Sequence, residues 1–400
     1  MPRYAWGRQS NAKEHLPQTH KDAWIWEGIC RHGVVGTVSS SALGSPSNAD
    51  RVTSSQGCDL ICSYDLQMDG KDVSPGCLPE WKEIPLPVTL ELSQGGNDSS
   101  TSRKWPCYSF EPMFKAVGEM NPQMKFNDID IICNRHSLRN LLLFCGGTKY
   151  LRSFRINLRL IQNTLLFETH DTRPFLEAGF GRAFENAART CPAEWKEGVS
   201  HYRALRYPLG ELSCVVRCEV DASHSGTEEP SWTSPPNGPD LGELSRNFEN
   251  SANIRSQNES ETMRQAGLKH QAMAAEIKSV AFYTSPSRWM PQLWFGRTPW
   301  LVCGTHSNGT FHEVTATNPG AFFHTWEDEN QIELQKLVMV LKHLRAITRN
   351  SGEGQYAAIF QAGPQSRARE IKVFRTTKRW QALPEPLISK FWDSPIPGSA

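Results

Sequence analysis

Two short acidic motifs in this chain have the residue types and the spacing of a divalent-cation site. The first is EVD, with Glu219 and Asp221, and the second is EIK, with Glu276 and Lys278. On a β-strand successive side chains point to opposite faces, so each motif places both of its functional groups on one face. Carboxylate oxygens suit Mg²⁺ or Mn²⁺, and a neighbouring ammonium can orient the attacking water. If the two strands lie side by side, the motifs predict a metal site for phosphodiester hydrolysis.

The same motifs also have a purely structural interpretation. Apolar residues flank the charges in VVRCEVDA and AAEIKSV, so we expect the acids to be at least partly buried. Buried acids need a cation or hydrogen-bond partners. A buried Glu–Lys ion pair across two strands would meet that need without any metal, and this alternative stays open at the level of the sequence.

Length and composition are those of an ordinary folded protein. The chain has 400 residues, of which 38% are hydrophobic and 21% are charged, enough for one large core or two smaller ones. The formal net charge is +1, so any surface that attracts nucleic acid must be local. Eleven scattered cysteines show no zinc-site spacing, which favours a reducing compartment. Since no apolar run is long enough to span a bilayer and the first residues lack a signal-peptide core, we expect an intracellular protein without a membrane partner, in the nucleus, the cytoplasm or both.

Composition predicts three parts along the chain. Residues 1–104 are rich in Ser, Gly, Pro and Asn, and we expect this N-terminal region to be largely irregular. Residues 105–380 carry the helix and strand patterns of the folded domain, interrupted at 223–271 by a polar insertion that is predicted to be disordered. Residues 381–400 are expected to form a Pro-rich tail.

Periodic patterns predict the elements that hold the candidate residues. Residues 154–170 alternate apolar and polar side chains and predict a hairpin that starts with a half-buried strand. Residues 200–222 predict a second hairpin, whose far strand delivers the EVD motif. Residues 178–190 have helical spacing and carry Glu185, and a long helix is expected at about 326–348. Strands and helices in this order predict an α+β fold.

Taken in order, these motifs resemble the DXO-type decapping exoribonucleases, a family of the PD-(D/E)xK nuclease superfamily. The resemblance runs along residues 128–315, about half of the chain. It is carried by DIICNRH at 130–136, NTLLFE at 163–168, GRAFE at 181–185, EVD at 219–221, EIK at 276–278 and QLWFGRTPWLVCGTHSNGTF at 292–311. The chain departs from the family's pattern at Cys218, where a glycine is usual, at Asn134 and His136, and in its long insertion.

The resemblance implies a central mixed β-sheet, nuclease-like core of two packed sheets flanked by helices. The implied ligands of Mg²⁺ or Mn²⁺ are four acidic residues, Glu185, Glu219, Asp221 and Glu276. Catalytic roles are implied for Glu219, Lys278 and Gln292, the last two placing the attacking water, and Arg135 would contact substrate phosphates. The implied substrate is an RNA 5′ end with an incomplete cap, a non-canonical cap or a triphosphate, and a 5′–3′ exoribonuclease is the implied partner protein.

Other interpretations stay open as well. Arg135 could pair with Asp128 or Asp130, Gln292 could be a surface amide, and Glu185 could be a solvated helix acid. The chain could keep the fold without catalysis and bind RNA or a partner exonuclease, or it could act on DNA. A prenyl-diphosphate synthase would need an all-helical chain with DDxxD motifs, which the sequence lacks, and no dinucleotide-binding motif or P-loop occurs either.

Overall fold

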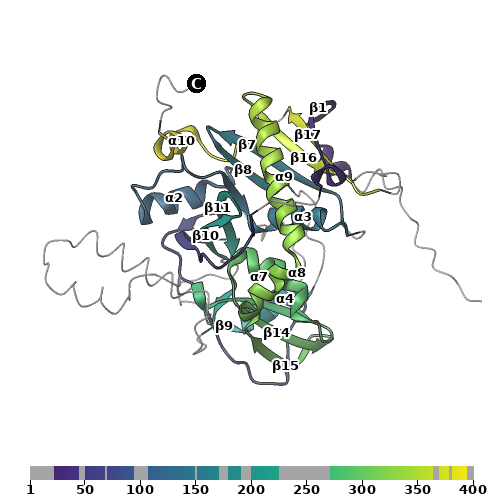
Figure 1. The fold of residues 1–400 in the computed structure, drawn as a ribbon. Helices are drawn as coiled ribbons and strands as arrows, with labels where there is room; N and C mark the ends of the chain where they lie inside the picture. Colours follow the sequence, from purple (N-terminus) through teal and green to yellow (C-terminus); the bar gives the residue numbers. More distant parts are fainter. Residues whose placement is uncertain are drawn as a thin grey trace, which may run out of the picture.

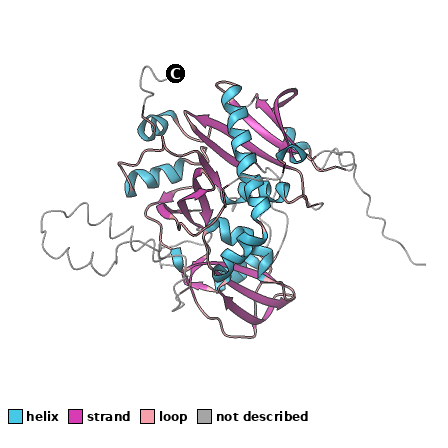
Figure 2. Cartoon of the chain, viewed as in Figure 1, coloured by secondary structure: helices cyan, strands magenta, loops and turns pink. Residues whose placement is uncertain are grey.

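The computed structural model describes the chain in ten stretches, namely residues 22–44, 50–67, 70–93, 107–148, 151–170, 179–190, 200–224, 271–363, 369–377 and 381–393. In these residues the chain forms two mixed β-sheets flanked by helices (Figures 1 and 2). The predicted α+β fold with two sheets is therefore confirmed. No described helix combines the length and the apolar character needed to cross a membrane.

The larger sheet supplies the scaffold of the molecule. Its ten strands lie in the spatial order β1 (Ile29–Ser39), β17 (Glu370–Thr376), β16 (Gln355–Phe360), β7 (Phe154–Ile161), β8 (Thr164–His170), β6 (Ile131–Asn134), β11 (Leu212–Glu219), β10 (Ser200–Leu209), β2 (Asp59–Leu66) and β3 (Asp72–Val73). Strand β6 runs parallel to β8 and β11, and the other neighbours are antiparallel. Both predicted hairpins, β7–β8 and β10–β11, are confirmed.

The smaller sheet carries the EIK motif. Its seven strands lie in the order β5 (Val88–Thr89), β15 (Thr310–Thr317), β14 (Trp300–Ser307), β13 (Ala274–Val280), β12 (Ala222–Ser223), β4 (Glu80–Trp81) and β9 (Arg189–Thr190). Strands β13 and β14 are parallel, as are β12 and β4, so this sheet is mixed too. At the lower end of the molecule in Figure 1 it sits below the larger sheet.

The chain changes sheets inside the EVD motif, which corrects one prediction. Glu219 is the last residue of β11 in the larger sheet, whereas β12 begins at Ala222 in the smaller one. The amide of Val220 still bonds to the carbonyl of His201 at 3.0 Å, and Ala222 then pairs with Ala275. Glu219 and Asp221 are therefore not on one face of one strand, and β11 is not the neighbour of β13.

Helices flank both sheets. They are α2 (Glu111–Met120), α3 (Arg135–Cys145), α4 (Gly181–Ala187), α7 (Met290–Gly296), α8 (Phe323–Glu329), α9 (Gln331–Asn350) and α10 (Glu385–Phe391), with the shorter 3-10 turns η1 (Ala23–Trp26), η2 (Ser40–Leu43), η3 (Pro286–Trp289) and η4 (Pro319–Phe322). The long helix predicted at 326–348 is thus two helices that meet at Asn330.

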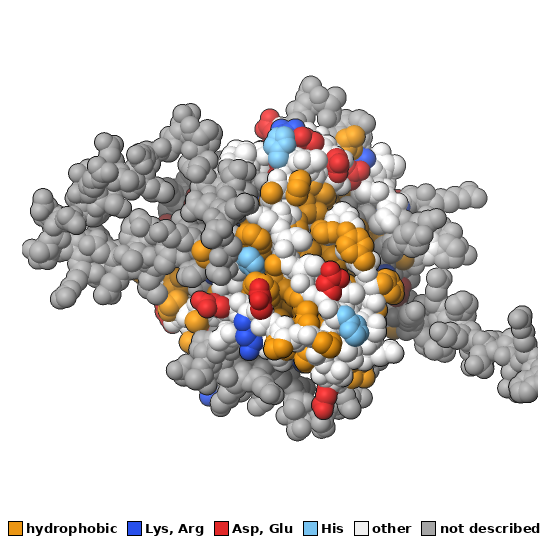
Figure 3. All heavy atoms as spheres, turned by 90° about the horizontal axis from the view of Figure 1, so that it is seen from below, with side chains coloured by type: hydrophobic (Ala, Val, Ile, Leu, Met, Phe, Trp, Pro, Cys, Tyr) orange, Lys and Arg blue, Asp and Glu red, His pale blue; other side chains and the backbone are white. Residues whose placement is uncertain are grey.

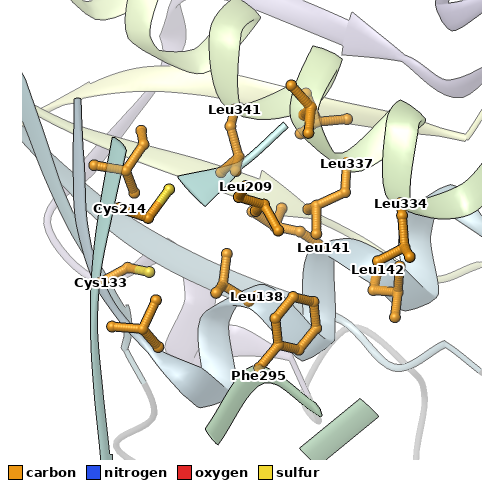
Figure 4. Close-up of a cluster of buried hydrophobic side chains, with 14 of the residues drawn as sticks. Cys133, Leu138, Leu141, Leu142, Leu209, Cys214, Phe295, Leu334, Leu337 and Leu341 are labelled. Atoms are coloured by element: carbon orange, nitrogen blue, oxygen red, sulfur yellow. The ribbon is translucent and has the colours of Figure 1, made fainter. Parts of the chain in front are cut away.

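The main core lies between the larger sheet and helices α3 and α9. Leu138 and Leu141 of α3 meet Leu337 and Leu341 of α9 in a fully buried cluster (Figure 4). The helical spacing of three or four residues brings these side chains to one face, and burying each leucine stabilises the fold by about 1.5–3 kcal/mol. This packing fixes α3, whose first residue is a candidate site residue.

The described parts of the N-terminal region and of the tail are ordered, contrary to prediction. Strands β1 to β5 all lie within residues 1–104, and Tyr64 of β2 is buried in the core beneath α2. In the predicted Pro-rich tail, α10 places Phe391 and Trp392 against Phe114 of α2. The partners of these aromatic residues are distant in sequence, so composition alone could not indicate the packing. Most of the predicted insertion, residues 225–270, lies outside the described residues.

Strand β7 is buried on both faces rather than on one. Arg155 and Asn157, which occupy the predicted polar face, are only 4% and 1% exposed. The guanidinium of Arg155 donates to the side-chain oxygen of Asn157 at 2.9 Å and to the carbonyl of Glu27 at 2.5 Å. The turn η1 therefore covers this face and satisfies its polar groups.

Gly304 provides the space in which α4 packs on the smaller sheet. A Cβ atom at this position would lie 2.4 Å from the ring of Phe184, the residue before Glu185. We expect Gly304→Ala to lower the free energy of unfolding by about 1–3 kcal/mol, because overpacking forces side chains from their rotamers. Denaturant unfolding measures this loss. Gly363→Ala is the control, since a Cβ there meets nothing within 4 Å; equal stabilities of the two variants would contradict the packing.

Candidate metal and hydrolysis site

Residues far apart in the sequence meet where the two sheets adjoin. Lys278 of β13 places its Nζ atom 2.6 Å from Oε2 of Glu276 and 3.3 Å from Oδ2 of Asp221. The backbone N–H of Ile277 donates to the same Asp221 oxygen at 2.8 Å. Asp221 thus reaches the EIK motif because the chain passes at this residue from the larger sheet to the smaller one. The predicted pairing of the EVD strand with the EIK strand is not what brings them together.

Glu276 is the most fully engaged carboxylate of the site. Its side chain is 1% exposed, and its Oε1 atom lies 2.6 Å from Nη2 of Arg135. Its Oε2 atom accepts from Lys278 and from the amide of Gln292. Burial by itself would raise the pKa of Glu276, but Arg135 and Lys278 outweigh this effect and hold the pKa at about 2. The group is therefore ionised at neutral pH, in a network that resembles the structural alternative considered for the sequence.

Arg135 begins α3 directly after β6 and lies behind Glu276. Its side chain is 11% exposed, and Glu276 raises the pKa of this guanidinium even though burial acts in the opposite direction. It contacts neither alternative partner, because Asp128 pairs with Arg206 and Asp130 pairs with Arg345. Its predicted contact with substrate phosphates stays a prediction.

Arg139 is a site residue that the sequence analysis did not identify. Its Nη1 atom donates to Oε1 of Gln292 at 2.8 Å, so the amide of Gln292 is held between Arg139 and Glu276. Gln292 is 9% exposed and is not a surface amide. Arg135 and Arg139 are four residues apart on α3, a spacing that places both on one face of a helix and could have indicated the pair.

Glu185 and Glu219 complete the acidic group. Glu185 of α4 pairs with Arg189 at 2.6 Å rather than standing free in solvent. Burial, together with the negative charges of Asp221 and Glu219, raises the pKa of Glu185 to about 8. Burial and the charge of Glu276 likewise raise the pKa of Asp221 to about 6. The four predicted ligands therefore lie close enough to repel one another.

The donor chemistry of this group fits Mg²⁺ or Mn²⁺, which prefer carboxylate oxygens. A bound cation would also relieve the repulsion that raises the pKa of Glu185 and Asp221. Yet the residues that the structure describes contain no group of three or more potential ligands arranged to hold a metal ion. The oxygens of Glu276 are instead engaged by Arg135, Lys278 and Gln292. The acids thus have the oxygen ligands that a metal site needs and lie in one region of the molecule. In this structure Glu185, Asp221 and Glu276 form ion pairs with Arg and Lys side chains.

The raised pKa of Glu185 predicts a pH effect on stability in the absence of metal. Between its ordinary value of 4.5 and about 8, the folded protein keeps a proton that the unfolded chain releases, so this group makes the free energy of unfolding fall as pH rises. Glu185→Gln removes the effect. We therefore expect the melting temperature of this variant, relative to that of the wild type, to increase from pH 5 to pH 8.5 in EDTA. The exposed acid Glu329, changed to Gln, is the control. A Glu185→Gln difference that does not change with pH would contradict the assignment.

Comparison with known proteins supports the fold. A family model described as a domain of unknown function (DUF8563) matches residues 38–392. Rai1 of Candida albicans in complex with pU5-Mn²⁺ is similar in structure, with a TM-score of 0.57 and 13% identity over 87% of this chain and 97% of that chain. Rai1 of S. pombe in complex with 3′-FADP has a TM-score of 0.56 and 12% identity over 85% and 99%. For Rai1 of Scheffersomyces stipitis in complex with (3′-NADP)⁺ and calcium ion, the TM-score is 0.54 and the identity is 13%, over 84% of this chain and 92% of that chain. No curated protein matches the sequence, and at these identities the likeness establishes the fold alone.

Proposed function

The chain belongs to the family described as a domain of unknown function (DUF8563), and we propose that it is a metal-dependent hydrolase of RNA 5′ ends. Its substrates would carry an incomplete cap, a non-canonical cap or a triphosphate, and it would cut cap pyrophosphate or phosphodiester bonds. The observation that carries this proposal is the meeting of Asp221, Glu276 and Lys278 where the sheets adjoin, in a fold like that of a Rai1 solved with pU5-Mn²⁺. From the order of its motifs we also propose that it is a divergent DXO-type enzyme that works with a 5′–3′ exoribonuclease in the nucleus or cytoplasm.

The proposed metal ligands are the acids that converge on the site, Glu185, Glu219, Asp221 and Glu276. Held there, Mg²⁺ or Mn²⁺ would stabilise negative charge on the phosphate and on the departing oxygen. The half-exposed carboxylate of Glu219 would also accept a proton from the attacking water.

Lys278 acts in this scheme as a fixed positive charge. Burial lowers the pKa of its ammonium, but Asp221 and Glu276 outweigh burial and raise the pKa above its ordinary value. In the metal-free protein this group therefore keeps its proton at neutral pH. It would orient the water and stabilise charge on the phosphate, at no cost of reorganisation during the reaction.

Gln292 and Arg135 hold Glu276 in place. The Gln292 side chain is fixed from its oxygen end by Arg139 and directs its N–H groups at Glu276. Arg135 forms a salt bridge with the other oxygen of that carboxylate. We propose that both residues position the carboxylate, with Gln292 also placing the attacking water and Arg135 reaching substrate phosphates once a cation shares the charge of Glu276.

A second candidate function is a nuclease-like protein that binds RNA or a partner exonuclease without hydrolysis. The observation in its favour is that Glu276 is already neutralised by protein donors. In that case the ion-pair network would be the final state of the site, and added metal would change nothing.

The experiment that tests the proposal is a cleavage assay. The protein is incubated with 5′-labelled RNA bearing an unmethylated cap or a triphosphate, with Mg²⁺, with Mn²⁺ or with EDTA. The proposed function predicts release of labelled 5′ products only with a divalent cation. RNA binding without any product in either metal would contradict the hydrolase and favour the second candidate, while cleavage of the matching DNA alone would reassign the substrate.

A further inference from the structure

The segment that joins the two site elements carries unusually exposed aromatic residues. Phe282 and Tyr283 are 77% and 84% exposed, the highest values among the large hydrophobic side chains of the described residues. They lie between β13, which holds Glu276 and Lys278, and the turn η3 that leads into α7 and Gln292. Two adjacent aromatic side chains this exposed offer ring faces that a ligand can cover.

The backbone of this segment is held by its own hydrogen bonds. Thr284 donates its hydroxyl to the carbonyl of Phe282 at 3.1 Å, and the hydroxyls of Ser285 and Ser287 lie 2.9 Å apart. The amide of Arg288 donates to the carbonyl of Ser285 at 3.1 Å. The segment is thus a defined turn, which keeps the aromatic rings outside the core.

The charges of this segment of the sequence favour an anionic ligand. No acidic residue occurs between Glu276 and Glu313. Arg288 is exposed and forms no ion pair within the described ranges. The smaller sheet forms the end of the molecule seen in Figure 3, where hydrophobic side chains gather and the scattered charged ones include both acidic and basic residues. An exposed cation that follows two solvent-facing rings in the same segment offers the groups that single-stranded nucleic acids bind, with bases on the rings and phosphate on the cation.

The distance to the proposed reaction centre is short. Phe282 follows Lys278 by four residues, and four residues of extended chain span at most about 14 Å. Nucleotides adjoining the scissile bond could therefore reach both rings. We propose that Phe282 and Tyr283 form a stacking platform for bases of single-stranded RNA next to the cleaved bond, and that Arg288 holds a phosphate of the same strand.

This inference deepens the proposed function and rests on it, and it makes a specific claim about recognition. Stacking uses the flat face that every base has, so the platform tolerates any sequence but requires a base. An RNA with abasic sites at the nucleotides on the platform should bind no better to the wild type than to a protein without the rings.

The test measures binding of a 3′-labelled, 5′-phosphorylated oligoadenylate by fluorescence anisotropy, with Ca²⁺ replacing Mg²⁺. Phe282→Ala/Tyr283→Ala should weaken binding by between about 5-fold and 150-fold for each stacked base, and abasic RNA should bind equally to both proteins. Phe282→Tyr/Tyr283→Phe is the matched control, because it keeps both rings and should bind like the wild type. Arg288→Ala should reduce the salt slope of log K by about 0.7, the value for one phosphate of a single strand.

The outcomes separate this inference from the proposed function. Unchanged affinity of the double alanine variant, in a wild type that binds RNA, overturns the platform and leaves the hydrolase intact; it is also the result expected if these rings dock a protein. A wild type that binds no RNA overturns both. An oligonucleotide with 2-aminopurine at successive positions gives a second reading, since quenching at the stacked position should disappear only when the rings are removed.

Discussion

Replacing Asp221 with asparagine is expected to lower the rate of RNA 5′-end hydrolysis by at least about a hundredfold, the range seen when a single charge-stabilising group is lost. Asp221 accepts a hydrogen bond from the backbone amide of Ile277, and its Oδ2 atom lies 3.3 Å from Nζ of Lys278. It therefore connects the point where the chain passes from one sheet to the other with strand β13, which carries the EIK motif. The amide replacement keeps the shape of the side chain but removes the charge that a divalent cation needs. Single-turnover cleavage of 5′-labelled triphosphate RNA at saturating Mn²⁺ measures the effect.

Asp128→Asn is the matched control, because it makes the same chemical change at a residue that is 63% exposed and paired with Arg206. We expect it to cleave like the wild type. If Asp221→Asn retained wild-type cleavage while remaining folded, the assignment of the site would be wrong, whatever enzyme activity the chain has.

Replacing Glu276 with alanine is expected to cost about 3–5 kcal/mol of the free energy of unfolding in metal-free buffer. The change leaves the charges of Arg135 and Lys278 in a buried site without their shared partner, and an uncompensated buried charge is strongly destabilising. Urea unfolding followed by tryptophan fluorescence measures the loss.

Two further variants show whether the buried charge is the cause. Glu313→Ala removes an exposed acid from β15 of the same sheet and should change stability by no more than about 0.5 kcal/mol. Glu276→Ala/Lys278→Met also removes the charge of Lys278, which Glu276→Ala alone leaves without its partner. The double variant should recover part of the lost free energy of unfolding, because the two residues are coupled. A Glu276→Ala protein as stable as Glu313→Ala would contradict the network.

The elements around the site could be predicted because their signals are local. Helix α4, the β10–β11 hairpin and strand β13 are each encoded by the periodicity of a few neighbouring residues, with Gly210 at a positive φ of 59° in the hairpin turn. The same local reading placed Glu185 on a helix and Lys278 on a strand.

What could not be predicted depends on contacts between distant residues. The pairing of Arg135 with Glu276 joins positions that are far apart in the sequence, and nothing near either residue encodes it. The change of sheets after Glu219 is caused by the pairing of Ala222 with Ala275, which a single-strand pattern does not show. Arg155 looked like a surface residue because its cover, the turn η1, lies in a region whose composition indicated irregular structure.

If Glu185, Glu219, Asp221 and Glu276 together bind a divalent cation, a calorimetric titration of the metal-free protein with Mn²⁺ detects the binding. We expect a saturable heat in the wild type that is lost in Glu219→Gln/Asp221→Asn and kept in Asp128→Asn. Absence of a Mn²⁺-dependent heat in the folded wild type, or an equal heat in the double variant, would contradict this expectation.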